Sequence, residues 1–227
     1  MHFSRILIIL AHPDDEIIGC GGTILKFRNK STIQVIFTCK TYDQRIELKK
    51  NNNNEVRQNL AKKTSDYLKI KKPIFLNYNG LFLKREDVTN MSKSIYNQII
   101  KYKPDTIFTH CLDDNHHDHR ATAEAVLIAT RTNHSTNFIK RLLCCEIPSA
   151  TDRLIKKNRN FSPIFFIDIS KQLNNKIKIL KKFYKKELKK YPHLLSIKGI
   201  KNLNNFRGNT VNLKSAEAFE VIFEKID

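Results

Sequence analysis

The stretch ILIILAHPDDEIIGCGG at residues 6–22 joins a continuous apolar run to a histidine, a proline, three acidic residues and three glycines. An uninterrupted apolar run such as residues 6–10 is typical of a strand buried on both faces of a parallel sheet. The polar residues that follow then lie at the carboxyl end of this strand. The stretch predicts an α/β fold in which His12, Asp14 and Asp15 stand at the edge of the sheet.

A second stretch repeats this arrangement, because the strand-like residues 106–109 lead into HCLDDNHHDH at residues 110–119. Ligands of open parallel sheets bind outside the carboxyl ends of the strands, so we expect the two polar stretches to converge. Together they hold five of the eight histidines beside six carboxylates. This ligand mixture suits zinc, and catalytic zinc usually keeps three protein ligands and one position for water. The two stretches predict a metal-dependent hydrolase.

The rest of the chain continues an alternation of strands and helices. Further strands are expected at residues 33–38, 74–77, 142–146 and 164–169, and helices at residues 23–27, 55–68, 92–102 and 120–130. A glycine-rich turn is expected before the first helix. Such alternation predicts a mostly parallel sheet covered by helices on both faces.

The C-terminal part differs in pattern but not in composition. A long helix is expected from about residue 170 to residue 190, followed by YPHLLS at 191–196 and SAEAFEVIFEKI at 215–226. No linker rich in proline, glycine or serine separates this part from the rest. We therefore expect a single domain over residues 1–227 with a C-terminal elaboration from about residue 170.

The chain is strongly basic, with 41 lysines and arginines against 22 acidic residues and a formal charge of +19. Such a field attracts nucleic acid, anionic lipid or phosphorylated substrates, and does not choose among them. Much of the excess is lysine scattered among asparagines, which a compositional bias of the source genome also explains. In residues 176–190 the apolar residues have helical spacing and lysines fill the other face, which favours a solvated face over anion or membrane-surface attraction.

The cysteine content and the apolar runs indicate a cytoplasmic protein. Five cysteines are an odd number without a CxxC pair, which favours reduced thiols. The first residues do not resemble a signal peptide, and no apolar run is long enough to span a bilayer. Cys39 and Cys111 follow predicted strands, but packing explains them, and they receive no role.

In the first motif, Asp14, Asp15 and Glu16 cannot all be buried and charged unless a cation or hydrogen-bond donors compensate them. His12 and Asp15 reach one ion from a turn, which leaves Asp14 to accept a proton from a metal-bound water. The alternative is an acidic cap at the start of the following helix. The glycines after the motif either cradle an anion or let backbones pack closely.

In the second motif, His119 at the first turn of a helix is the natural third protein ligand. His116 is predicted to stabilise an oxyanion, and Asp118 to hold an imidazole in the required tautomer. The alternative is a set of exposed polar loop residues. His110, Asp113 and Asp114 are undecided between loop capping and support of the ligands.

These residues resemble the two defining motifs of the LmbE-like, or PIG-L, zinc-dependent N-deacetylases, namely HPDDE at residues 12–16 with its glycines and HHDH at residues 116–119. Later segments resemble the branch associated with bacterial surface-polysaccharide sugars. These segments are CEIPSATDR at 145–153, FSPIFFIDIS at 161–170, YPHLLS, and FRGNTVNLKSAEAFE at 206–220. The resemblance implies a Rossmann-like three-layer sandwich and removal of the acetyl group from an N-acetylated amino sugar.

Carried onto this chain, the resemblance implies that His12, Asp15 and His119 bind one zinc ion, with Fe²⁺ as an alternative metal. It implies that Asp14 is the general base and that His116 polarises the carbonyl or stabilises the tetrahedral intermediate.

Three further residues are candidate substrate contacts by the same resemblance: Arg57, His193 and Arg207. The alternative to substrate contact is a solvated side chain for Arg57. For His193 and Arg207 the alternative is a role in capping or packing. The chain also departs from the family pattern, because Asn79 stands where an aspartate is expected and Asn209 where a glycine is usual. These departures concern substrate contacts and leave the zinc motif complete.

The expected partner is a small N-acetylated sugar. The positive charge of the chain would attract a sugar linked to an anionic carrier such as a nucleotide or a lipid. Whether the chain forms a homo-oligomer is left open. One rival is a Mg²⁺-dependent enzyme acting on a nucleotide sugar or phosphoester, against which the histidine ligands argue. The other rival is a basic nucleic-acid-binding module, whose binding would weaken steeply with salt.

Overall fold

The computed structural model describes residues 3–41, 53–131, 134–151 and 161–226. Within these residues a seven-stranded sheet has the strand order β3-β2-β1-β4-β5-β7-β6. The strands are β1 (Arg5–Leu10), β2 (Thr32–Cys39), β3 (Ile74–Tyr78), β4 (Thr106–Thr109), β5 (Arg141–Cys145), β6 (Phe165–Asp168) and β7 (Ala216–Glu224). Strands β1 to β5 pair in parallel, and β7 runs antiparallel to both β5 and β6.

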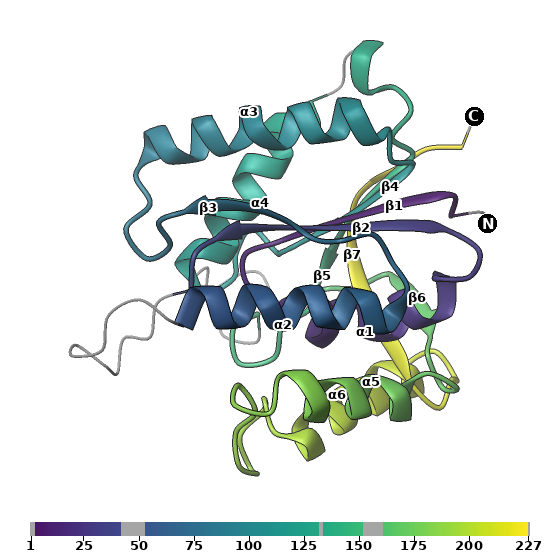
Figure 1. Cartoon of the computed structure of the whole chain (residues 1–227). Helices are drawn as coiled ribbons and strands as arrows, with labels where there is room; N and C mark the ends of the chain where they lie inside the picture. The colour runs from purple at the N-terminus through teal and green to yellow at the C-terminus, as the bar shows by residue number, and fades with distance from the viewer. Residues whose placement is uncertain (1–2, 42–52, 132–133, 152–160, 227) are drawn as a thin grey trace.

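Helices cover both faces of this sheet (Figure 1). They are α1 (Asp15–Phe27), α2 (Asn53–Leu68), α3 (Arg85–Tyr102), α4 (His117–Ala129), α5 (Leu173–Phe183) and α6 (Ile197–Asn209), with a short 3-10 turn, η1, at His134–Thr136. Helices α3 and α4 lie on one face, α1 and α2 lie on the other, and α5 and α6 form an outer layer beneath them. The predicted α/β fold with a mostly parallel sheet is confirmed.

The central strand β1 explains why the sheet is buried on both faces. Ile6, Ile8 and Leu10 point into the core beneath the sheet, and Leu7 and Ile9 point into the core above it. All five are fully buried, as alternation of side chains in a strand requires when both faces are covered.

The glycine-rich turn expected after β1 is wrong, because α1 begins at Asp15 and the glycines lie inside the helix. A Cβ atom on Gly19 would lie 2.9 Å from the Sγ atom of Cys145, and one on Gly22 would lie 2.5 Å from the Cγ2 atom of Ile169. The glycines therefore allow α1 to pack closely on the neighbouring chain segments, which is the packing alternative rather than an anion cradle.

The C-terminal elaboration also differs from the prediction. Helix α5 ends at Phe183 instead of about residue 190, because Tyr184 is drawn into the interior and Glu187 turns toward α2. Helix α6 was not predicted, and the final segment forms strand β7 in the main sheet. No helix in the described part of the chain is long and apolar enough to cross a membrane.

Candidate metal and catalytic site

The two polar motifs meet because β1 and β4 are neighbours in the sheet and run in the same direction. After β1, four residues lead into α1, and Asp14 adopts a φ of 117°. This conformation is costly for a side chain other than glycine and is found mostly where the surroundings enforce it. Here Glu16 accepts a hydrogen bond from the Asp14 backbone N–H at 2.9 Å, and Asp15 accepts one from the His12 N–H at 2.9 Å.

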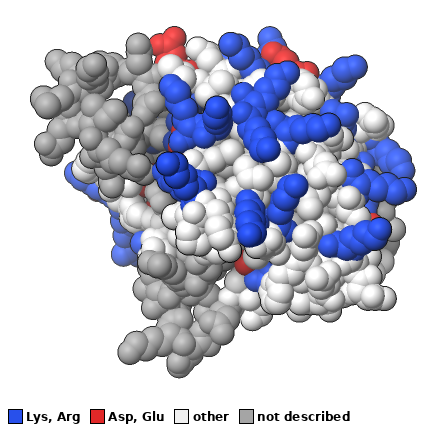
Figure 2. Space-filling model, turned by 90° about the horizontal axis from the view of Figure 1, so that it is seen from below, with Lys and Arg blue, Asp and Glu red and all other residues white. Residues whose placement is uncertain are grey.

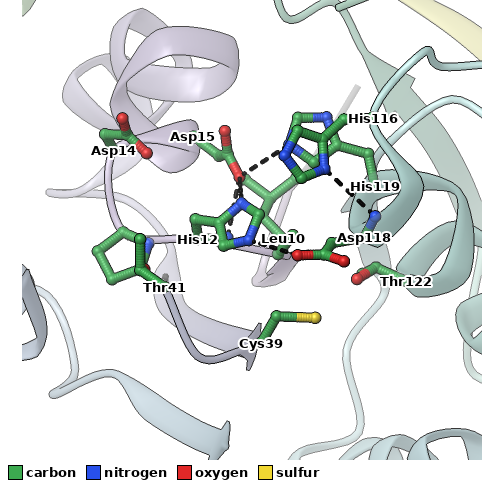
Figure 3. Close-up of polar contacts among 12 residues, drawn as sticks. Leu10, His12, Asp14, Asp15, Cys39, Thr41, His116, Asp118, His119 and Thr122 are labelled. Atoms are coloured by element: carbon green, nitrogen blue, oxygen red, sulfur yellow. Dashed lines mark hydrogen bonds and ion pairs between the residues drawn. The ribbon is translucent and has the colours of Figure 1, made fainter. Parts of the chain in front are cut away.

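Three side chains present their ligand atoms to one point (Figure 3). The Oδ2 atom of Asp15 lies 3.7 Å from Nδ1 of His12 and 3.5 Å from Nε2 of His119. One ligand atom from each of the three lies within 4.8 Å of the others. Burial by itself would raise the pKa of Asp15, but the facing imidazoles, above all His119, hold that pKa below its usual value. The arrangement favours a charged carboxylate beside two imidazoles.

Each of these two imidazoles has a carboxylate at its outer nitrogen. Nε2 of His12 lies 2.9 Å from Oδ2 of Asp118, and Nδ1 of His119 lies 3.1 Å from Oδ2 of Asp114. An outer carboxylate fixes the tautomer, so that the inner nitrogen presents a lone pair. Both carboxylates are held in turn: Asp118 accepts a hydrogen bond from the backbone N–H of Leu81 at 2.7 Å, and Asp114 accepts one from the Thr151 hydroxyl at 3.1 Å.

His116 caps the N-terminus of α4, where its Nδ1 atom accepts a hydrogen bond from the Asp118 backbone N–H at 3.2 Å. The ring therefore carries its proton on Nε2 when neutral. Burial, together with the nearby His119 and His12, lowers the pKa of His116 to about 4. At neutral pH the side chain is an uncharged imidazole whose Nε2–H is available as a donor at the pocket.

His110 packs against His119. Its ring is stacked on that of His119, with centroids 3.8 Å apart and an interplanar angle of 5°. Its Nε2 atom accepts a hydrogen bond from the Ala11 N–H at 2.9 Å, and burial lowers its pKa to about 4. His110 and Asp114, which the sequence left undecided, both contact His119. The only sequence signal for them was their place in the same histidine-rich loop.

Asp14 faces the pocket and pairs with an arginine from α2. Nη2 of Arg57 lies 3.0 Å from Oδ1 of Asp14, donates to the Pro13 carbonyl at 2.8 Å and lies 3.7 Å from Oε2 of Glu187. Burial raises the pKa of Asp14 well above its usual value, although Arg57 opposes this. A carboxyl with a raised pKa beside a pocket is suited to proton transfer near neutral pH.

Glu16 connects the first motif to the C-terminal part of the chain. Its Oε1 atom accepts a 2.6 Å hydrogen bond from the hydroxyl of Tyr184, the residue that caps α5. Both side chains are buried. The burial of Glu16 itself raises the pKa of its carboxyl to about 7. Sequence reasoning missed this contact, because Tyr184 read only as an apolar position of a helix.

These groups line a pocket of about 310 Å³. Its polar side is formed by His12, Asp14, Asp15, Arg57, His116, His119 and Glu187. The apolar part of the lining includes Ile18, Ile147, Pro148 and Leu195. The volume is that of a small-ligand site with a few convergent polar groups.

Two predicted substrate contacts lie away from the described pocket lining. Arg207 makes a bidentate ion pair with Glu146, with nitrogen–oxygen distances of 2.6 and 2.8 Å. His193 is exposed, and its Nδ1 atom accepts a hydrogen bond from the Leu195 N–H at 3.0 Å. Substrate contact by these two residues stays a prediction, whereas Arg57 does line the pocket. Cys39 is buried, and burial raises the pKa of its thiol to about 12, which favours the protonated thiol at neutral pH.

A family model described as PIG-L, GlcNAc-PI de-N-acetylase, matches residues 7–130. The chain belongs to the PIG-L family. The match covers more than half of the chain and includes both polar motifs, so the predicted family is confirmed. The prediction of an enzyme that hydrolyses an amide is confirmed at the level of the family. A search of curated protein sequences finds no match.

Solved structures have the same fold as this chain over nearly its whole length. The N,N'-diacetylchitobiose deacetylase from Pyrococcus horikoshii is 18% identical, with a TM-score of 0.75, over 97% of this chain and 84% of that one. The A40926 pseudoaglycone deacetylase Dbv21 is 18% identical, with a TM-score of 0.74, over 99% of both chains.

A third structure with this fold has another activity. The 4-carboxy-2-hydroxymuconate hydratase GalB from Pseudomonas putida KT2440 is 14% identical, with a TM-score of 0.78, over 99% of this chain and 98% of that one. Similarity at this level establishes the fold, and the activity of the chain has to be argued from its own site.

Proposed function

We propose that this chain is a zinc-dependent hydrolase that removes the acetyl group from an N-acetylated amino sugar. The observation that carries the proposal is the pair of carboxylate-bound imidazoles whose inner nitrogens face Asp15. Outer carboxylates of this kind accompany histidines that bind metals. Family membership supports amide hydrolysis, and the acetylated substrates named for two structural neighbours support an acetyl group on a sugar.

The donor set fits zinc better than magnesium. We infer that His12 and His119 contribute one nitrogen each and Asp15 one oxygen, which is a three-ligand set with room for water. Mg²⁺ prefers an all-oxygen shell and keeps its waters, so two imidazoles disfavour it. Zinc bound there would polarise the acetamide carbonyl and lower the pKa of the attacking water.

Asp14 is the proposed proton carrier of the reaction. Its carboxylate accepts a proton from the water whose oxygen attacks the acetamide carbon. The same proton then goes to the amine nitrogen as the carbon–nitrogen bond breaks, which releases acetate and a free amine. Nη2 of Arg57 lies 3.0 Å from Oδ1 of Asp14, and its positive charge opposes the rise in pKa that burial imposes on this carboxyl, which favours its role as a base.

His116 is the proposed donor to the developing oxyanion. Its Nε2–H is uncharged, fixed by the cap of α4 and present without a proton transfer at the moment of attack. Loss of such a preorganised donor costs on the order of 3 kcal/mol of transition-state stabilisation. Asp118 then acts on the reaction through His12, which it orients.

We also infer that the whole chain works as one unit, since the pocket draws on residues from His12 to Leu195. The proposed location is cytoplasmic, supported by five cysteines that are all buried free thiols. The proposed substrate is a small N-acetylated sugar, and its carrier is left to experiment.

The test is acetate release from a panel of N-acetylated sugars and nucleotide sugars with the zinc-loaded enzyme. Asp14→Ala and His119→Ala should abolish release, and only His119→Ala should lower zinc content from one ion per chain. Glu124→Gln, an exposed change on the same helix as His119, is the control and should keep full activity. Zinc-independent release, or normal release by Asp14→Ala, would refute the proposal.

A further inference from the structure

The positive charge of the chain is concentrated in one part of it. Residues 171–214, named here the basic lobe, contain twelve lysines and one arginine but one acidic residue, Glu187. The lobe makes up about a fifth of the chain, yet it holds +12 of the formal charge of +19. A compositional bias would spread the excess evenly along the chain. The concentration therefore points to a local property of the α5–α6 layer.

Most of this charge is on the outside of the molecule. Lys176 is the exception, because it is buried and pairs with Glu217 at 2.7 Å. Arg207 pairs with Glu146, and Glu187 with Arg57. The other eleven lysines are exposed or half-exposed, and none of them lies within ion-pair distance of a carboxylate of the described residues. Figure 2 looks onto this side, where many blue side chains and few red ones are visible.

Large apolar side chains are exposed among these lysines. Tyr191 and Leu194, in the connection between α5 and α6, are 56% and 43% exposed, and Phe206 on α6 is 57% exposed. Nζ of Lys198 lies 4.3 Å from the centre of the Tyr191 ring. Lysines interspersed with exposed aromatic and aliphatic side chains are typical of surfaces that lie in a membrane interface.

The basic lobe also forms part of the pocket rim. Glu187 and Leu195 both belong to the lobe, and both line the pocket. The lobe therefore reaches the pocket at these two residues.

We propose that the basic lobe docks the protein on an anionic lipid surface and presents the pocket to sugars held there. The lysines supply attraction to lipid phosphates, and Tyr191, Leu194 and Phe206 supply apolar contact with the bilayer boundary. A nucleic acid would use the same charge and could stack on Tyr191 and Phe206, but Leu194 offers no stacking surface to a base and suits the bilayer boundary instead. The pocket side of the proposal rests on the proposed function, whereas the lipid docking does not.

The test is co-sedimentation of the full chain with vesicles of phosphatidylcholine alone and of phosphatidylcholine with 30% phosphatidylglycerol. Binding to the anionic vesicles should be at least tenfold stronger and should weaken with salt. A triple lysine-to-glutamine variant of the lobe should lose at least tenfold of this binding; its positions are Lys181, Lys185 and Lys186. A control with the same change of net charge should lose less than threefold; its positions, exposed and outside the lobe, are Lys30, Lys93 and Lys101.

A second variant tests the apolar part of the lobe. Tyr191→Ser combined with Leu194→Ser leaves the charge unchanged and should weaken vesicle binding about tenfold at physiological salt. If the lobe variant and the control variant lost vesicle binding equally, net charge alone would explain the binding, and the proposal would be overturned. Equal binding to both vesicle types, or tighter binding to single-stranded nucleic acid than to anionic vesicles, would also overturn it. Because none of these measurements uses acetate release, they are independent of the proposed enzymatic activity.

Discussion

The hydrogen bond between Tyr184 and Glu16 leads to a prediction that needs no knowledge of the substrate. Tyr184→Phe removes the hydroxyl that donates to Glu16 at 2.6 Å and keeps the buried ring. A hydrogen bond to a neutral acceptor contributes about 1 kcal/mol and one to a charged acceptor about 1.5–3 kcal/mol. The pKa of Glu16 is about 7, so at pH 7 both states of the acceptor are populated. We therefore expect a loss of about 2 kcal/mol in the free energy of unfolding.

The assay is urea denaturation of the metal-free protein at pH 7, followed by far-UV circular dichroism. In a parallel thermal unfolding experiment, a loss of about 2 kcal/mol corresponds to a fall in Tm of about 4–8 °C for a chain of this length. The matched control is Tyr102→Phe, which removes a hydroxyl that donates to the Thr32 carbonyl at 2.7 Å on a more exposed surface. That bond has a neutral acceptor, and its loss should cost about 1 kcal/mol or less.

The same substitution tests the link between the C-terminal part and the proposed base. Glu16 holds the Asp14 backbone N–H in the conformation with a φ of 117°, so a displaced Glu16 should misplace the Asp14 carboxyl. We expect Tyr184→Phe to lower kcat about tenfold with zinc affinity unchanged, since Tyr184 touches no proposed ligand. Equal stability losses in Tyr184→Phe and Tyr102→Phe, or weaker zinc binding in Tyr184→Phe, would refute this reasoning.

Three further predictions concern the metal site, the buried ion pair and pH. Asp118→Asn removes the carboxylate at the outer nitrogen of His12 and should weaken zinc binding about 10–100-fold in a chelator competition, with the fold intact. Glu217→Leu strands the buried ammonium of Lys176 and should cost about 3–5 kcal/mol in urea denaturation, while Lys176→Met combined with Glu217→Leu should recover only part of this loss, because Glu217 also accepts hydrogen bonds from Gly22 and Thr23. The folded-state pKa of Glu16 is about 7 against an ordinary value of 4.5, so the unfolded carboxyl ionises first as pH rises. Stability from this group is therefore present below pH 4.5 and declines by about 3 kcal/mol toward pH 7, a slope that Glu16→Gln should remove when both proteins are compared in metal-free unfolding experiments.

The sequence alone determined the fold class and the place of the site. Runs such as residues 6–10 are apolar on both faces, and a strand with that property has to lie inside a parallel sheet covered by helices. The order of the chain then puts a polar motif at the carboxyl end of such a strand. His12, Asp15 and His119 could be expected to meet for this reason, and the structure brings them together. Local periodicity and covalent order are enough for this inference, because both are properties of neighbouring residues.

The tertiary structure alone decided how those residues are held. The pairing of Asp114 with His119 joins side chains five positions apart through the path of a loop, and sequence spacing could not choose it over other partners. Tyr184 lies 168 positions from Glu16, and its hydroxyl reaches the motif only because α5 packs beneath α1. The same packing ends α5 early and leaves the lysines of the basic lobe on the outside. Contacts of this kind depend on how whole elements pack, which no local pattern of apolar and polar residues records.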